Sequence, residues 1–321
     1  MSQHDSRMQR RRRFDDEIDE RYEPFSPRRT HAPAVDTAEW DERGDTDIDG
    51  PPEGDRWTTW DGAAHGPDPR PAWVITEHAA VDTELGILKT GKEADVHLLE
   101  RSVPGTDRRG LLAAKRYRTG EHRLFHRDAG YLEGRRVRRS REMRAMANRT
   151  AFGRDVIAGQ WAGAEFAALT VLWSDGVPVP YPVSYDGTEV LIEFLGGADS
   201  STGEATAAPR LAQLRPDPDA LADLWHQLVD ALHGMARRGW AHGDLSAYNV
   251  LVEQRGGTDR LVLIDLPQVV DIVGNPNGPE FLARDVTRIG EWFVARGLPP
   301  EVGQPAVLLE ELAEEAGITP H

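Results

Sequence analysis

The 321-residue sequence contains no cysteine. This absence excludes disulfides, thiolate zinc sites, iron–sulfur ligation and cysteine nucleophiles, and it is compatible with a reducing, cytoplasmic location, which we expect. No run of residues approaches 18 apolar positions, so the sequence predicts no membrane span and no membrane partner. The arginine-rich start is not followed by an apolar segment, so it does not have the pattern of a secretory signal.

Lysine is also scarce. Among the 38 lysine and arginine residues, the only lysines are Lys89, Lys92 and Lys115. Codon usage that favours arginine is the plainer explanation of this ratio. It does not explain why the three lysines fall so close together. Arginine presents a broad planar fork, whereas lysine is a compact point charge on a flexible stem. The pattern therefore indicates a pocket that requires an ammonium group.

Residues 1–70 have little hydrophobic periodicity and much charge of both signs, with 18 acidic and 11 basic side chains. This composition predicts a disordered, acidic and arginine-rich tail. The mean hydropathy of −0.54 agrees with a chain that is only partly packed. The net charge of −16 argues against polyanion binding through the overall field of the protein.

Folding signals begin near Trp73, so we expect one folded domain over residues 71–321. Its first part, residues 71–195, is rich in strand patterns. The expected elements are strands on either side of a turn in 85–99, strands at 111–117 and 190–194, a helix over 157–172 and an extended segment at 177–183. A link rich in helix and strand breakers follows at 196–210.

The second part, residues 205–321, is rich in helix patterns. Apolar residues recur at three- and four-residue steps from Leu221 to Met235, after the helix-starting pair Asp217-Pro218. Further helices are expected over 279–296 and 305–316. A hairpin is expected after the helix that contains Leu221–Met235 and before the helix over 279–296. The order of elements predicts an α+β fold with a strand-rich half, a hinge and a helix-rich half.

The strongest chemical signal lies between the long helix and the hairpin. Asp244 and Asn249 are five residues apart in HGDLSAYN, and the second hairpin strand leads to Asp265. Phosphoryl transfer requires a carboxylate that faces the nucleophile and oxygen ligands that hold Mg²⁺ against phosphates. The sequence therefore predicts Asp244 as a catalytic residue and Asn249 and Asp265 as metal ligands. A helix-end turn with incidental polar residues is the alternative, which does not account for the three features occurring together.

The first half offers a matching set of phosphate-binding candidates. Gly91 allows close backbone approach in the turn of TGKEADV, and Lys92 adds positive charge there. Lys115 ends a strand, and Glu165 on the following helix could hold it by an ion pair. The alternatives are a solvent-facing strand end for Lys115 and an ordinary helical position for Glu165.

Five segments in this order resemble the RIO-type atypical serine/threonine protein kinases. They are LKTGKEADV, LLAAKRYRT, IEFLGG, HGDLSAYNVLV and LIDLPQ, and the likeness extends from Leu85 to Phe293. The resemblance implies a bilobal protein-kinase-like fold with a small strand-rich N-lobe over 71–195 and a reduced helical C-lobe over 205–321. It also implies that ATP and Mg²⁺ bind between the lobes.

The resemblance assigns roles to individual residues. It places the ATP phosphates at Gly91, Lys92 and Lys115, and the adenine at the hinge backbone of Glu193 and Leu195. It matches Asp244 to the catalytic aspartate, and Asn249 and Asp265 to the metal ligands. In this family the metal-binding aspartate can also accept the phosphoryl group, which gives Asp265 a second role and implies ATPase activity.

Two positions depart from the family pattern. Pro267 stands where the family usually has serine, and it removes a backbone donor from the metal-binding loop. Lys89 replaces the usual serine before Thr-Gly-Lys and adds positive charge near the expected phosphates.

The sequence after Asp265 is too short for the activation segment and the peptide-docking helices of ordinary protein kinases. The acceptor is therefore unidentified, and it is either another protein or the chain itself through autophosphorylation. Between Arg108 and Arg144 there are 13 basic against 4 acidic residues. Within this stretch, the insert 118–144 is a candidate surface for RNA, an acidic protein or the chain's own acidic tail, and a solvated flap is the alternative.

The favoured hypothesis is a serine/threonine kinase, an ATPase, or both. Two alternatives stay open at this stage. HGDLSAYNVLV also resembles the loop of aminoglycoside and choline kinases, which phosphorylate small molecules and usually have a larger helical half. A nucleotide-binding switch with little catalysis is the other alternative, and Pro267 is the residue that favours it.

Overall fold

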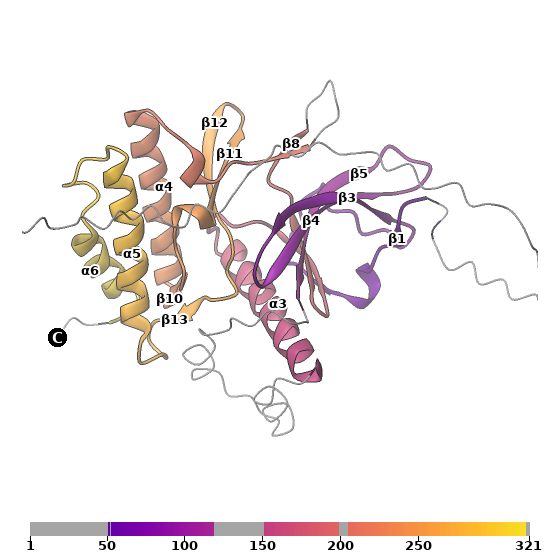
Figure 1. Ribbon diagram of the computed structural model, residues 1–321, viewed down its shortest axis with the longest axis horizontal. Helices are drawn as coiled ribbons and strands as arrows, with labels where there is room; N and C mark the ends of the chain where they lie inside the picture. Colours follow the sequence, from indigo (N-terminus) through magenta and orange to yellow (C-terminus); the bar gives the residue numbers. More distant parts are fainter. Residues whose placement is uncertain (1–50, 52, 119–150, 199–204, 319–321) are drawn as a thin grey trace, which may run out of the picture.

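The computed structural model describes residues 51, 53–118, 151–198 and 205–318. These residues form a strand-rich lobe and a helix-rich lobe, as Figure 1 shows. The chain passes from the first lobe to the second near residue 195. The predicted α+β, bilobal, kinase-like arrangement is confirmed. The basic insert lies outside the described residues from position 119 onwards, so its predicted partners stay predictions.

The N-lobe is built on one antiparallel seven-stranded sheet with the order β1-β3-β4-β5-β7-β6-β2. Its strands are β1 (Arg56–Trp57), β2 (Ala64–His65), β3 (Val81–Thr90), β4 (Ala94–Ser102), β5 (Arg109–Tyr117), β6 (Pro182–Asp186) and β7 (Glu189–Glu193). Alternating apolar residues such as Leu99, Leu112 and Leu191 face a small core on one side of the sheet. The expected strands of this lobe are therefore present, and they begin and end within a few residues of the predicted positions.

Helix α3 (Ala151–Ser174) packs against strands β5, β6 and β7, and it contains the helix predicted over 157–172. Residues 156–174 are long and apolar enough to span a membrane by length and composition alone. However, Ala162, Leu169 and Leu172 are fully buried inside the protein. This burial identifies α3 as the core helix between the sheet and the C-lobe.

The tail predicted to be disordered over residues 1–70 includes residues that are folded. Strands β1 and β2, with the short helix η1 (Trp60–Gly62) between them, join opposite edges of the sheet. Trp60 is buried beside Val74 and stacks on His65. The prediction of disorder up to residue 70 is therefore wrong for residues 56–65, because two-residue strands leave no detectable period in a sequence. Residues 1–50 and 52 lie outside the described part of the chain.

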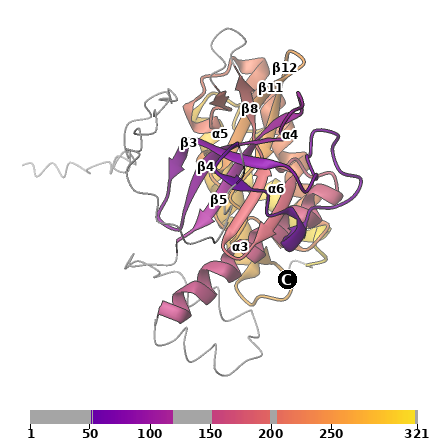
Figure 2. The same ribbon diagram turned by 90° about the vertical axis from the view of Figure 1, so that its right-hand side faces the viewer.

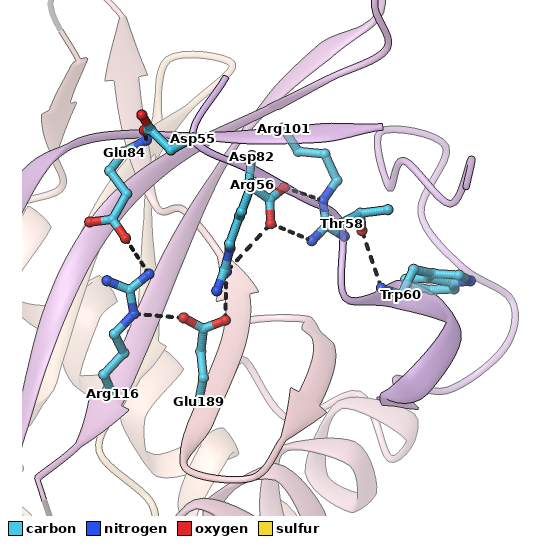
Figure 3. A network of polar contacts seen from close by, with 9 residues as sticks. All are labelled: Asp55, Arg56, Thr58, Trp60, Asp82, Glu84, Arg101, Arg116 and Glu189. Atoms are coloured by element: carbon cyan, nitrogen blue, oxygen red, sulfur yellow. Dashed lines mark hydrogen bonds and ion pairs between the residues drawn. The ribbon is translucent and has the colours of Figure 1, made fainter. Parts of the chain in front are cut away.

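A ladder of alternating charges joins β1 to the centre of the sheet (Figure 3). The buried Asp82 carboxylate accepts two hydrogen bonds from Arg101, at 2.7 and 3.0 Å. Arg56 lies 3.4 Å from Asp82 and donates to Glu189 at 2.6 Å. Glu189 also accepts a 2.6 Å bond from Arg116, the neighbour of Lys115 on β5. The segment before residue 71 is thus tied to the strand that carries Lys115.

The C-lobe core is formed by helices α4 (Pro218–Ala236), α5 (Gly278–Ala295) and α6 (Pro305–Glu315), which Figures 1 and 2 show on the side away from the sheet. Asp217 caps α4 through a 2.9 Å bond from the Ala220 N–H, and Pro218 occupies the first turn, as predicted. Leu224, Leu228 and Phe293 are fully buried between the helices. The three predicted helices are confirmed.

Short strands complete the described chain. They are β8 (Gly196–Ala198), β9 (Ala205–Ala207), β10 (Trp240–Ala241), β11 (Val250–Arg255), β12 (Thr258–Leu263) and β13 (Val270–Asp271), with the short helices η2 (Leu211–Gln213) and η3 (Ala247–Asn249). The predicted hairpin is β11–β12. The predicted link at 196–210 contains the pair β8–β9, which the breaker-rich composition concealed.

Candidate active site between the lobes

Three charged side chains from distant parts of the sequence meet where the lobes join. The Lys115 Nζ on β5 donates to Oε1 of Glu165 on α3 and to Oδ1 of Asp265, each at 2.7 Å. The other Glu165 oxygen accepts a 2.5 Å bond from the hydroxyl of Tyr117. An ammonium group has three N–H donors, so one donor of Lys115 remains for a ligand after these two bonds.

The charges of this cluster determine its ionisation. Burial raises the pKa of the Asp265 carboxyl, but the Lys115 ammonium outweighs that effect and lowers the pKa to about 2. Burial by itself lowers the pKa of Lys115. The negative charges of Asp265 and Glu165 outweigh this effect, so the Lys115 pKa is raised. Burial, followed by the negative charge of Glu165, raises the pKa of Tyr117 well above its usual value. At neutral pH the cluster therefore holds a charged lysine, a charged aspartate and a neutral tyrosine.

The backbone of Asp265 has a φ of 67°. Among the described residues it is the one non-glycine residue in the left-handed region, which aspartate enters more readily than most side chains. Strain of this kind is typical of functional sites, where the surrounding structure imposes the conformation. Here the Lys115 bond and the strand before it fix the carboxylate at the lobe junction.

Pro267 fits the loop that follows Asp265. The Val269 N–H donates to the Leu266 carbonyl at 3.3 Å, so residues 266–269 form a turn with Pro267 at its second position. Proline is favoured at that position because its fixed φ matches the turn. The Leu266 N–H, in turn, donates to Glu165 at 3.3 Å. The sequence-based concern about Pro267 is therefore resolved, since the turn requires no donor from residue 267.

Asp244 lies in the loop between β10 and η3, and Asn249 is the last residue of η3. Gly243 has a φ of 86°, and a β-carbon at this position would collide with the Gln268 carbonyl. The Asn249 Nδ2 donates to the Asp244 backbone carbonyl at 2.9 Å, and the Asn249 carbonyl accepts from the Ile264 N–H at 3.0 Å. These bonds connect the loop to the segment that leads into Asp265.

Helix α5 holds the same loop with three polar side chains that the sequence analysis did not single out. The buried Asp285 carboxylate accepts from the N–H groups of Gly243, at 2.7 Å, and Leu245, at 3.1 Å. Arg284 donates to the Gly243 carbonyl. Arg288 lies 3.1 Å from the Asp244 carboxylate. Asp285 could have been found in the sequence, because it occupies an apolar position of an otherwise amphipathic helix.

The β3–β4 turn contains the predicted phosphate-binding pair. The Gly91 N–H donates to the Ala94 carbonyl at 3.0 Å, and a β-carbon on Gly91 would lie only 2.7 Å from that oxygen. The turn therefore requires glycine. Lys92 is exposed at its tip, and Lys89 lies close enough to Asp265 for their charges to interact. Burial, followed by the charge of Arg210, lowers the Lys89 pKa.

The predicted hinge lies where the two lobes are joined. The Glu193 N–H donates to the Tyr181 carbonyl at 2.8 Å, and the Leu195 carbonyl accepts from the Ala208 N–H at 2.9 Å. Leu195 is buried. Among the described residues, the Leu195 N–H has no acceptor. A planar ring with a hydrogen-bond acceptor could use this N–H.

The polar atoms at the junction fit a magnesium ion that is shared with phosphates. Because the Asn249 amide N–H₂ is bonded, its Oδ1 is available as a ligand, and Asp265 retains Oδ2 after Oδ1 binds Lys115. Two protein oxygens, with phosphate and water, complete the shell that Mg²⁺ prefers. The described residues contain no group of three His, Asp or Glu side chains that could bind a metal by themselves.

The structure therefore brings Lys115, Glu165 and Asp265 into direct contact and connects Asn249 to them through the backbone. Asp244 lies in the loop that leads into η3, the short helix that ends at Asn249. Gly91 and Lys92 lie in the β3–β4 turn, and within the described part of the chain no hydrogen bond or ion pair joins them to this cluster.

Comparison with known protein families matches residues 106–304 to the RIO domain. The RIO-type serine/threonine-protein kinase Rio1 of Haloferax volcanii is 30% identical over 227 residues, which cover 70% of this chain and 68% of the relative. The serine/threonine-protein kinase rio2 of Schizosaccharomyces pombe is 28% identical over 220 residues, which cover 68% of this chain and 54% of the relative.

Solved structures give a weaker match. The Rio2 kinase from Chaetomium thermophilum, as a complex with ADP, Mg²⁺ and phosphoaspartate, aligns with a TM-score of 0.48 and 21% identity. The alignment covers 73% of this chain and 67% of that chain.

Proposed function

The chain belongs to the RIO family of serine/threonine-protein kinases, and from this membership we propose that it transfers the γ-phosphoryl group of ATP to a hydroxyl acceptor or to water. The observation that carries the proposal is the contact of Lys115 with both Glu165 and Asp265 across the lobe junction. A buried lysine held between two carboxylates, with one donor left over, is suited to binding phosphate oxygens.

Each residue of the cluster has a distinct task in this reaction. Lys115 binds the α- and β-phosphates, and Glu165 holds the ammonium group in position. Asn249 and Asp265 would hold Mg²⁺, which neutralises charge on the phosphates when it is bound. Leu195 and Glu193 would contact the adenine through their backbone, and Gly91 and Lys92 would cover the phosphates.

Asp244 is proposed to orient the acceptor. Its carboxylate would accept the proton of the attacking hydroxyl while the bond between the γ-phosphorus and the bridging oxygen breaks, which releases ADP. The contact with Arg288 holds one carboxylate oxygen in place. Asp285 and Arg284 serve as positioning residues because they fix the loop backbone on either side of Asp244.

An ATPase route would use the same site. In that route an Asp265 oxygen attacks the γ-phosphorus, ADP leaves, and water then hydrolyses the acyl phosphate. The left-handed backbone of Asp265 holds its carboxylate at the lobe junction, which supports this second role.

Labelled ATP distinguishes the two routes. The protein is incubated with [γ-³²P]ATP and Mg²⁺, denatured in acid and then treated with hydroxylamine. Label released by hydroxylamine indicates phosphoaspartate, and stable label indicates phosphoserine or phosphothreonine. Absence of both protein labelling and phosphate release would refute the proposed function.

The other sequence-based alternatives have less support. The family match does not favour a small-molecule phosphotransferase, and the turn at Pro267 removes the argument for a switch with little catalysis. A cytoplasmic location stays a prediction.

A further inference from the structure

Three arginines of the C-lobe have no carboxylate partner among the described residues. Arg215 and Arg296 both donate to the Leu214 carbonyl, at 2.8 and 3.1 Å, and Arg210 donates to the Tyr248 carbonyl. Among the other arginines whose side chains the structure describes, Arg116, Arg238 and Arg288 are examples that form an ion pair, whereas Arg255 at the tip of the β11–β12 hairpin does not. An arginine held by a neutral carbonyl keeps its full charge available for an anion.

Arg210 and Arg296 lie near one exposed aromatic residue, and Arg215 lies beside Arg296. Tyr248 has 57% of its surface exposed, and its backbone carbonyl accepts the hydrogen bond from Arg210. Burial, followed by the charge of Arg215, lowers the pKa of Arg296. The positive charge of Arg215 therefore acts directly on Arg296. We call Arg210, Arg215, Arg296 and Tyr248 the arginine surface.

The arginine surface begins at the candidate active site. Tyr248 directly precedes Asn249, and the short helices η2 and η3 that carry the neighbouring residues are in contact. Arg210 is close enough to Asp265 for their charges to interact. A ligand on this surface would thus extend away from Asp265 and past the loop that carries Asp244.

The charge of this surface contrasts with that of the whole chain, which is −16. A basic site in an acidic protein attracts a specific anionic ligand, whereas the overall field repels polyanions. The guanidinium fork binds carboxylates in pairs of hydrogen bonds, and an exposed tyrosine offers both an apolar ring and a hydroxyl.

We propose that the arginine surface docks an acidic polypeptide segment that carries the serine or threonine acceptor. This inference rests on the proposed kinase function for the step that follows docking. The acceptor hydroxyl would then attack the γ-phosphorus, lose its proton to Asp244 and release ADP. Single-stranded RNA fits less well, because Arg296 covers the ring of Trp292 at 4.7 Å and leaves Tyr248 as the exposed aromatic of this surface.

The test uses two fluorescent 15-residue peptides with a central serine, one flanked by glutamates and the other by lysines. Binding is measured by fluorescence anisotropy without ATP, for the full-length wild type and for Arg215→Glu, Arg296→Gln and Arg255→Glu. Arg255→Glu is the matched control, because that arginine also lacks a carboxylate partner among the described residues and lies at the exposed tip of the β11–β12 hairpin.

We expect the wild type to bind the acidic peptide about tenfold or more tightly than the basic peptide. Arg215→Glu should weaken acidic-peptide binding about tenfold, and the control should change it less than about twofold. For phosphorylation of the acidic peptide, kcat/KM should fall more in Arg215→Glu than in the Arg255→Glu control. The KM for ATP should stay unchanged in both variants. The KM for ATP distinguishes a docking defect from a damaged fold.

Equal binding of the two peptides, or equal effects of Arg215→Glu and Arg255→Glu, would overturn the docking proposal. Loss of labelled poly(U) binding in Arg215→Glu, with peptide binding unaffected, would also overturn it and assign the surface to RNA. Acidic-peptide binding with the expected variant pattern but no ATP turnover would refute the proposed function alone. ATP turnover without peptide discrimination would refute the docking proposal alone.

Discussion

Lys115 and Asp265 are separated by 150 residues in the chain, and their side chains meet at 2.7 Å. Lys115 belongs to the N-lobe sheet, and Asp265 follows the last strand of the C-lobe hairpin. The ion pair therefore connects the two lobes at the point where the proposed reaction takes place. Because Glu165 shares the same ammonium group, helix α3 is part of this connection.

Asp265→Asn should lower Mg²⁺-dependent ATP turnover by about 10²- to 10³-fold, since it removes a charge that would hold the metal ion and the phosphates. The substitution preserves the shape of the side chain. Phosphate release, measured at saturating ATP and Mg²⁺, tests this expectation. Asp259→Asn, near the tip of the β11–β12 hairpin, is the control and should retain the wild-type rate. Wild-type turnover by Asp265→Asn would contradict the assignment.

The pH dependence of stability follows from the direction of the two pKa shifts in the ion pair. The pKa of Asp265 in the folded protein, about 2, lies below its value of about 3.9 in an unfolded chain. The contribution of Asp265 to the free energy of unfolding is thus fully present above about pH 4 and is lost as the pH falls towards 2. The raised pKa of Lys115 keeps its contribution intact throughout the neutral and mildly alkaline range.

Urea unfolding of the wild type and Asp265→Asn from pH 3 to 9 measures this contribution. The difference in unfolding free energy between the two proteins should be constant from about pH 5 to 9 and should narrow below about pH 4. A difference that varies across the neutral range would show that another group titrates at the lobe junction.

Gly243→Ala should disrupt the catalytic loop, because Gly243 is buried and has a left-handed backbone. The positive φ disfavours any side chain, and a β-carbon would strike the Gln268 carbonyl in the metal-binding loop. Gly256→Ala is the control, because Gly256 also has a positive φ but has open space around it. We expect the control to lose about 1 kcal/mol of stability and to keep its activity. Gly243→Ala should lose more stability and most of its ATP turnover.

Asp285→Ala tests the support of the loop by helix α5. The change leaves the N–H groups of Gly243 and Leu245 without their acceptor in a buried position, which should cost about 2–4 kcal/mol of unfolding free energy. Asp230→Ala on the exposed side of α4 should change stability by less than about 0.5 kcal/mol. Thermal or urea denaturation measures both, and equal effects of the two variants would show that Asp285 has no special role.

Much of the fold follows from local sequence patterns. The periodicity from Leu221 to Met235, with Asp217-Pro218 before it, is sufficient to predict α4. The turn at residues 255–257 similarly predicts the β11–β12 hairpin. Strands β1 and β2 could not be predicted, because they have two residues each and are stabilised by pairing with distant strands and by the ladder through Arg56.

The candidate site was also predicted in part. Asp244, Asn249 and Asp265 stand out by their spacing, and the scarcity of lysine singles out Lys115. The contact of Lys115 with Asp265 depends on how the lobes meet, which no local pattern determines. Arg288 and Arg210 have no sequence signal, because arginine is abundant in this chain and only the tertiary structure brings these two to the catalytic loop.

The most direct test of the account is a crystal structure with Mn²⁺ and a non-hydrolysable ATP analogue, in which anomalous scattering locates the metal. We predict a manganese peak bound by the Asp265 carboxylate and the Asn249 amide oxygen, with the Lys115 ammonium on the α- and β-phosphates. A triphosphate bound away from Lys115, or a metal bound without Asp265, would contradict the account.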